Sequence, residues 1–255
     1  MTLTAARSEL PAALAELATV FAYRPYRPGM PACPHCVSDE DLRGLGRPVD
    51  EIPLPLLARY ARKALTTWGE VPDLQRLLPR LLALVAEGAP PIDAAVVAAK
   101  LARGGWTHWP VHEREAVSAF FGAWWDDGLR SPPGAVAPPV PVRLDAAAAT
   151  ADLASILERW HLHLDDGEPD VRLTAALHLA ELVNRPAFDP LDRLAAGRLL
   201  SVPADGAVEQ LSSWLAGSTT AIQLARAVYD FVQHPEVSRL ATADVRLARF
   251  RVTRS

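Results

Sequence analysis

Hydrophobic residues recur every three to four positions along almost the whole chain, and this period constrains the fold more than any other feature. In residues 55–68, for example, Leu57, Tyr60, Ala64 and Trp68 share one helical face. Apolar side chains at this spacing form the buried stripe of an amphipathic α-helix. No segment shows the sustained alternation of a β-strand bounded by hairpin turns. The sequence therefore predicts an all-α protein.

Proline and glycine separate these amphipathic segments into about ten predicted helices. Pro55 opens one helix and Gly69 ends it, whereas Pro79 lies inside the apolar segment 74–85 and is expected to kink or split that helix. Short turns between amphipathic helices produce antiparallel helical hairpins, which stack into an irregular bundle or a HEAT-like α-solenoid. The word DVRLTAAL, residues 170–177, resembles the start of the second helix of a HEAT repeat, but a period of roughly 40 residues is not sustained.

A proline-rich segment divides the chain into two predicted lobes. Residues 131–143, SPPGAVAPPVPVR, hold five prolines within ten positions, a density that excludes a helix or central strand and favours an extended connection. We therefore expect an N-terminal helical lobe over residues 1–130 and a C-terminal helical lobe over residues 144–255. The last residues, VRLARFRVTRS, suit either a final helix or an extended arm with solvated arginines.

Charge and cysteine content exclude several classes of protein. A net charge of −4 gives the chain no general attraction to nucleic acid or to an anionic membrane. No uncharged stretch is long and apolar enough to span a bilayer, and the opening MTLTAARSEL lacks the apolar core of a secretory signal. Because the chain has two cysteines and no disulfide framework, we expect a cytoplasmic location.

The two cysteines, Cys33 and Cys36, lie in the word CPHC and admit three interpretations. The first is a redox pair, since CPHC resembles the active-site tetrapeptide of the DsbA family of thiol oxidants. That chemistry requires a thiolate of lowered pKa and a second thiol within reach. The motif belongs after a β-strand and at the start of a helix, but here a proline-rich loop precedes it. This context argues against a thiol oxidant of that fold.

The charges near CPHC do not decide whether a thiolate is favoured. Asp39, Glu40 and Asp41 lie directly downstream and oppose a thiolate. Arg24 and Arg27 lie upstream and would offset those acids. The sequence alone does not show which of these side chains approaches the sulfurs.

The second interpretation is a zinc site. A CxxC pair supplies two of the four ligands of a structural zinc ion, so histidines elsewhere must supply the others. Pro110 separates His108 from His112 and keeps them from sharing one helical turn. Zinc bound by Cys33, Cys36, His108 and His112 would therefore depend on long-range folding. The third interpretation, which we favour, is a rigid loop with two structural, half-buried thiols.

Other catalytic motifs are absent or incomplete. The word HEREA, residues 112–116, begins like a zinc-protease helix but lacks the second histidine. P-loop, dinucleotide-binding, nucleophile-elbow and EF-hand patterns do not occur in the sequence. Asp126 and Asp127 precede a glycine and are interpreted as solvated turn residues. Trp106 and Trp109, in the word GGWTHWP, are expected to fix that turn onto the core.

Four words between residues 20 and 125, CPHCV, KALTTWG, LPRLLAL and GW…WP, resemble those of a family of helical bacterial proteins to which no activity is assigned. The resemblance implies no cofactor, partner or catalytic residue. Since catalytic signatures are lacking, we expect a non-enzymatic helical protein that presents a groove or surface to a protein partner, with no membrane or nucleic-acid partner. The alternative is a zinc-binding or thiol-redox protein centred on Cys33 and Cys36.

Overall fold

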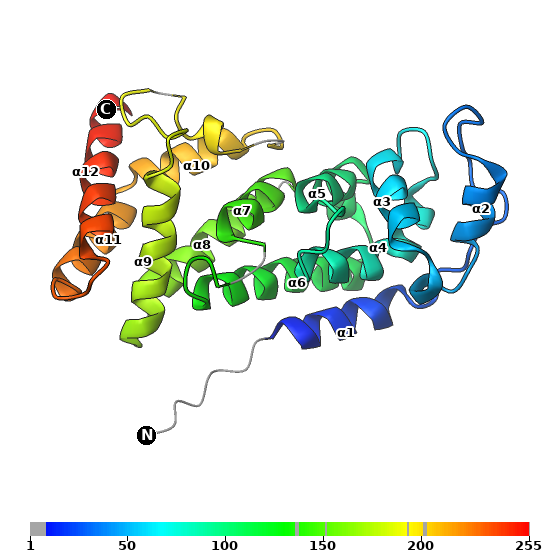
Figure 1. Ribbon diagram of the computed structural model, residues 1–255, viewed down its shortest axis with the longest axis horizontal. Helices are drawn as coiled ribbons and strands as arrows, with labels where there is room; N and C mark the ends of the chain where they lie inside the picture. The colour runs from blue at the N-terminus through cyan, green and yellow to red at the C-terminus, as the bar shows by residue number, and fades with distance from the viewer. Residues whose placement is uncertain (1–8, 136–137, 151, 193, 201–202, 255) are drawn as a thin grey trace, which may run out of the picture. The chain divides into compact units, whose positions relative to one another are not determined.

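The described part of the chain consists of helices joined by short turns. The computed structural model describes residues 9–135, 138–150, 152–192, 194–200 and 203–254. Within these ranges it contains twelve α-helices, three short 3₁₀ helices and no β-strand (Figure 1). Extended backbone pairs there only as isolated bridges, of Trp68 with Ala32 and with Ala64. The predicted all-α class is confirmed, with helices packed as in a bundle, whereas a regular solenoid repeat is not established.

The chain divides into two compact units after Trp124. The first unit contains α1 (Leu10–Phe21), α2 (Asp39–Leu45), η1 (Val49–Glu51), α3 (Leu54–Lys63), α4 (Val71–Ala86), α5 (Ala94–Arg103), η2 (Trp106–His108) and the beginning of α6 (Val111–Arg130). Local signals set these helices: Ser38 and Asp41 form a capping box at the start of α2, and Asp93 accepts two backbone N–H bonds at the start of α5. Within the unit, α1 packs against α4, and α3 packs against α5.

The second unit has its own apolar core. It contains the end of α6, α7 (Val140–Ala149), α8 (Leu153–Leu164), α9 (Pro169–Val183), η3 (Gly197–Leu199), α10 (Ala207–Ala216), α11 (Ser218–Asp230) and α12 (Val237–Arg254). Three indoles lie at its centre: the ring centroid of Trp160 is 5.2 Å from that of Trp125 and 5.0 Å from that of Trp214. Such aromatic contacts add to the stabilisation from buried area. α12 packs against both α9 and α11.

Two helices differ from what proline placement predicts. α7 begins at Val140, inside the segment expected to be extended. Pro139 precedes this helix and Pro141 lies in its first turn, where the missing N–H removes no helical hydrogen bond. α4 continues through Pro79 as one helix and is not split. The division between the two units lies within α6, ahead of the proline-rich segment.

The arginine-rich C-terminal segment is helical, and two of its arginines bind the ends of other helices. Arg246 Nε donates to the carbonyl of Val183, the last residue of α9, at 2.8 Å. Arg251 Nε donates to the carbonyl of Ala216, the last residue of α10, at 3.0 Å. These carbonyls have no partner within their own helices. The expectation of solvated arginines is therefore wrong for Arg246 and Arg251.

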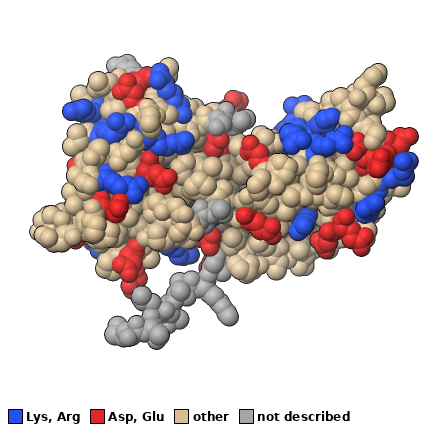
Figure 2. All heavy atoms as spheres, viewed as in Figure 1, with Lys and Arg blue, Asp and Glu red and all other residues tan. Residues whose placement is uncertain are grey.

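Basic and acidic side chains are interspersed on the surface. Figure 2 shows lysine and arginine side chains close to aspartate and glutamate side chains over much of the visible face. Arg239 and Glu236, for example, form an ion pair at 2.7 Å. None of the helices in the described ranges combines the length and apolarity that crossing a bilayer requires.

Candidate functional site

The CPHC loop lies between α1 and α2 and is held against the segment that follows α3. The backbone N–H of Cys33 donates to the carbonyl of Thr67 at 2.9 Å, and the N–H of Gly69 donates to the carbonyl of Pro31 at 2.7 Å. Thr67 and Gly69 belong to the word KALTTWG. The CPHCV and KALTTWG motifs, both identified in the sequence, therefore contact each other in the fold.

The loop brings two free thiols together in one turn. The N–H groups of Cys36 and Val37 both donate to the carbonyl of Cys33, at 2.9 and 3.0 Å. Both cysteines are half-buried and carry free thiols. The pKa of the Cys33 thiol is lowered, chiefly because the backbone N–H of His35 donates to its sulfur. The Cys36 thiol and the Lys63 ammonium act in the same direction, while partial burial opposes them.

Lys63 is the cation that sequence reasoning missed. It is the last residue of α3, and its Nζ donates to the carbonyl of Cys36 at 2.8 Å. Arg24 and Arg27, which the sequence offered instead, pair with glutamates at 2.5 and 2.7 Å. The sequence predicts a helix that Gly69 ends, with Lys63 on its solvated face. Instead α3 ends at Lys63, and the Lys63 side chain reaches the CPHC loop.

The acids downstream of the loop are engaged or face solvent. Asp41 accepts from the backbone N–H of Ser38 at 3.0 Å and from Arg59 at 2.7 Å. Asp39 and Glu40 are exposed in the first turn of α2. The acids therefore serve the start of the helix, where negative charge is favourable.

The four predicted zinc ligands do not form a recognisable cluster. His108 and His112 are both exposed, at the end of η2 and in the first turn of α6. Throughout the ranges that the structure describes, no three His, Cys, Asp or Glu side chains are grouped so that they could hold a metal ion. A structural zinc ion requires four ligands. Zinc binding by Cys33, Cys36, His108 and His112 stays a prediction.

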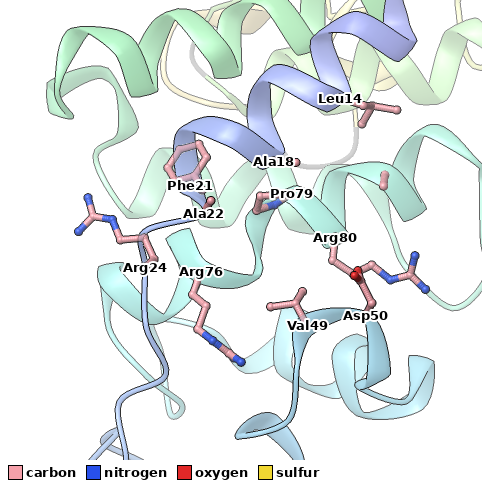
Figure 3. Close-up of a pocket in the computed structure, with 11 residues that line it drawn as sticks. Leu14, Ala18, Phe21, Ala22, Arg24, Val49, Asp50, Arg76, Pro79 and Arg80 are labelled. Atoms are coloured by element: carbon pink, nitrogen blue, oxygen red, sulfur yellow. The ribbon is translucent and has the colours of Figure 1, made fainter.

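A pocket of about 340 Å³ lies in the same unit, formed by α1, η1 and α4. In Figure 3, side chains of α1 lie along one side of this pocket and Val49 and Asp50 lie along the other, with Pro79 of α4 between them. Most of the lining is apolar and includes Leu14, Ala18, Phe21, Ala22 and Ala83. The pocket was not expected from the sequence, since its walls come from three separate segments.

Arg24, Arg76 and Arg80 surround this pocket and are held to different degrees. Arg24 pairs with the buried Glu113 at 2.5 Å. Arg76 donates to two backbone carbonyls at and after the end of α2, at 2.9 and 2.7 Å. No hydrogen bond or ion pair joins the Arg80 guanidinium to the described residues, and its Nε is buried. Arg80 is therefore the arginine with donors available to a ligand.

Glu113 is fully buried and joins three segments of the first unit. Its Oε1 accepts from the Tyr23 hydroxyl and from Arg24 Nη2, and its Oε2 accepts from Gln75 Nε2 at 2.8 Å. The hydrogen bond to Glu113 is the main cause that raises the pKa of Tyr23. Because both oxygens are occupied, the carboxylate anchors Arg24 beside the pocket and does not serve as a free acid or base. Glu113, the first glutamate of the HEREA motif, therefore has a structural role.

Trp106 and Trp109 are buried, as the sequence predicts. Trp109 Nε1 donates to the carbonyl of Gly104 at 3.0 Å, and its ring meets Phe21 edge to face at 6.0 Å. The two indoles therefore fix the turn between α5 and α6 onto the core.

Asp126 is not a solvated turn residue, contrary to the sequence interpretation. It lies within α6 and is buried, accepting from Arg159 Nη1 at 2.6 Å and lying 3.0 Å from His163 Nε2. The helix continues past both aspartates to Arg130, so the following glycine does not end it. A small cavity of about 150 Å³ adjoins this cluster.

No family model, curated protein or solved structure matches this chain. Its function must therefore be inferred from the chemistry of the sites themselves.

Proposed function

We propose that the protein is a non-enzymatic binding protein, and that it docks an acidic segment of a protein partner in the pocket between α1, η1 and α4. The support is the chemistry of the pocket wall, in which three arginines and a single carboxylate, Asp50, accompany an otherwise apolar lining. A volume of about 340 Å³ is small for a ligand site and suits one anchoring side chain better than a large cofactor.

The proposal rests on the guanidinium of Arg80. This guanidinium has no hydrogen bond or ion pair with the described residues, and its Nε is buried. A carboxylate binds a guanidinium through two parallel hydrogen bonds, which makes arginine selective for acidic groups. The partner is therefore expected to present an Asp or Glu beside a large apolar side chain that covers the pocket floor.

Site-specific photo-crosslinking tests the proposal with a matched pair of positions on one helix. Ala18 lines the pocket, whereas Ala15, also exposed on α1, does not. A photoreactive residue at each position is activated in cells that produce the protein naturally, and the crosslinked peptides are sequenced. We expect Ala18 alone to capture a defined protein segment, and that segment to contain acidic and large apolar residues.

A charge reversal separates docking from chance contact. Arg80→Glu should abolish capture from Ala18, whereas Arg43→Glu, at an exposed position of α2 outside the pocket, should leave capture unchanged. Circular dichroism verifies that both variants remain folded. Capture of the same proteins from Ala15 and Ala18, or of a basic segment, would contradict the proposal.

A further inference from the structure

We propose that Cys33 and Cys36 form a reversible intramolecular disulfide, through which the loop exchanges thiols with a disulfide-bearing substrate. The Cys36 N–H binds the Cys33 carbonyl at 2.9 Å, which closes a tight turn over residues 33–36. Both cysteines carry free thiols and are half-buried. A turn closed by this hydrogen bond holds the Cα atoms of its first and last residues within about 7 Å of each other, close to the span that a disulfide bridges.

The turn assigns different roles to the two sulfurs. The pKa of the Cys33 thiol is lowered, chiefly by the backbone N–H of His35. The Lys63 ammonium, which donates to the Cys36 carbonyl at 2.8 Å, acts in the same direction. Backbone donors and a cation stabilise negative charge on the attacking sulfur. Cys33 is therefore the nucleophile, and Cys36 is the thiol that resolves the mixed disulfide.

The surroundings of the loop suit repeated oxidation and reduction. Both cysteines are half-buried, so a substrate reaches them without unfolding of the chain. Hydrogen bonds from Cys33 to Thr67 and from Lys63 to Cys36 hold the loop against the segment after α3. These contacts use backbone atoms of the cysteines, and disulfide formation leaves them in place.

The reaction balances with a low-molecular-weight disulfide such as oxidised glutathione. The Cys33 thiolate attacks one sulfur, the disulfide bond of glutathione breaks, and one glutathione thiolate leaves. The Cys36 thiol then loses its proton to solvent and attacks the Cys33 sulfur, which expels the second glutathione thiolate. The protein loses two electrons, and the glutathione disulfide gains them to become two thiols.

This chemistry does not require the strand and helix that flank the active-site tetrapeptide in the DsbA family. The described residues contain no sheet, yet the backbone N–H that chiefly lowers the pKa of Cys33 belongs to His35, within the turn itself. The site is separate from the α1–η1–α4 pocket, none of whose lining residues belongs to the loop. Failure of either proposal leaves the other standing.

The full chain, equilibrated with mixtures of oxidised and reduced glutathione and then quenched with an alkylating reagent, provides the test. Mass spectrometry should show that both thiols are lost together as the oxidised fraction rises, and that they return on reduction. Cys36→Ser should accumulate glutathione on Cys33 and stop there. Cys33→Ser should react several-fold more slowly, because this variant loses the thiol whose pKa is lowered.

Three results would overturn the proposal. The first is a chain that keeps both thiols in oxidised glutathione. The second is a disulfide that forms only between chains. The third is purified protein with one zinc ion per chain that protects both sulfurs. If a serine variant fails to fold, the unaltered chain is treated with a limiting amount of oxidised glutathione instead. Peptide mapping then shows which cysteine carries glutathione first, and modification of Cys36 before Cys33 would contradict the assigned roles.

Discussion

Glu113 shows how a buried charge is stabilised at the scale of one residue. Three donors from two segments occupy its carboxylate, and Arg24 supplies the compensating charge. We expect Glu113→Gln to lower the free energy of unfolding by about 3 kcal/mol, because it leaves a partly buried guanidinium without its counter-charge. Glu115→Gln, exposed on the same helix, should change it by less than about 0.5 kcal/mol. Urea unfolding followed by circular dichroism measures both, and equal effects would contradict this account.

His178 couples the stability of the second unit to pH. Its Nε2 lies 2.7 Å from the carbonyl of Ser131, and the side chain is buried. Burial lowers its pKa below the ordinary value of 6.5, and Arg143 acts in the same direction, while the carbonyls of Ser131 and Gly128 and the carboxylate of Glu181 oppose this. The unfolded chain therefore binds a proton that the folded chain does not. This contribution to stability is present above pH 6.5 and is lost as the pH falls through 6.5 toward the lower pKa of the folded state.

Substitution of this histidine tests the sign. His178→Gln keeps a donor for the Ser131 carbonyl but does not titrate, so its stability should fall less than that of the unaltered chain between neutral pH and mildly acidic pH. His35→Gln, at an exposed position in the CPHC loop, should follow the unaltered chain. Thermal unfolding in buffers across this range compares the three. A His178→Gln variant with an unchanged pH dependence would refute the linkage.

At the scale of elements, arginines from α12 complete the ends of other helices. Arg246 binds the Val183 carbonyl of α9, whereas Arg249 is exposed on the same helix. Arg246→Met keeps the apolar stem but leaves the carbonyl unpaired, so we expect the free energy of unfolding to fall by about 2 kcal/mol. Arg249→Met should leave it within about 0.5 kcal/mol of the original value. Chemical unfolding at one pH measures the difference, and indistinguishable variants would show that the contact has no net effect.

The elements themselves could be predicted from local sequence, but their contacts could not. A helix is visible in the spacing of its own apolar residues, and the all-α class follows from that spacing. The partner of Arg246 lies 63 residues away in the chain, and Tyr23 lies 90 residues from Glu113. Lys63 reaches the CPHC loop across 27 residues. Such pairs depend on how helices pack, and no period or motif in a single sequence encodes that packing.

At the scale of the whole molecule, the CPHC loop and the α1–η1–α4 pocket differ in how far local sequence predicts them. The CPHC loop is contiguous, so the sequence located its two thiols, although not the amide donors and lysine around them. The α1–η1–α4 pocket is assembled from segments on both sides of the loop, so no local pattern reveals it. Charge is likewise distributed, with acidic and basic groups interspersed in Figure 2.

This distribution of charge predicts that the chain does not bind duplex DNA at moderate salt. The chain carries a net charge of −4, and Arg246 and Arg251, part of its most basic segment, bind helix-end carbonyls. Binding to DNA requires several free cations that displace counterions from phosphates, and its affinity then falls steeply with salt. We expect no binding of the full chain to labelled duplex DNA in fluorescence anisotropy between about 50 and 200 mM salt. Micromolar binding that weakens over this range would mean that arginines at the C-terminus leave their carbonyl partners for phosphate.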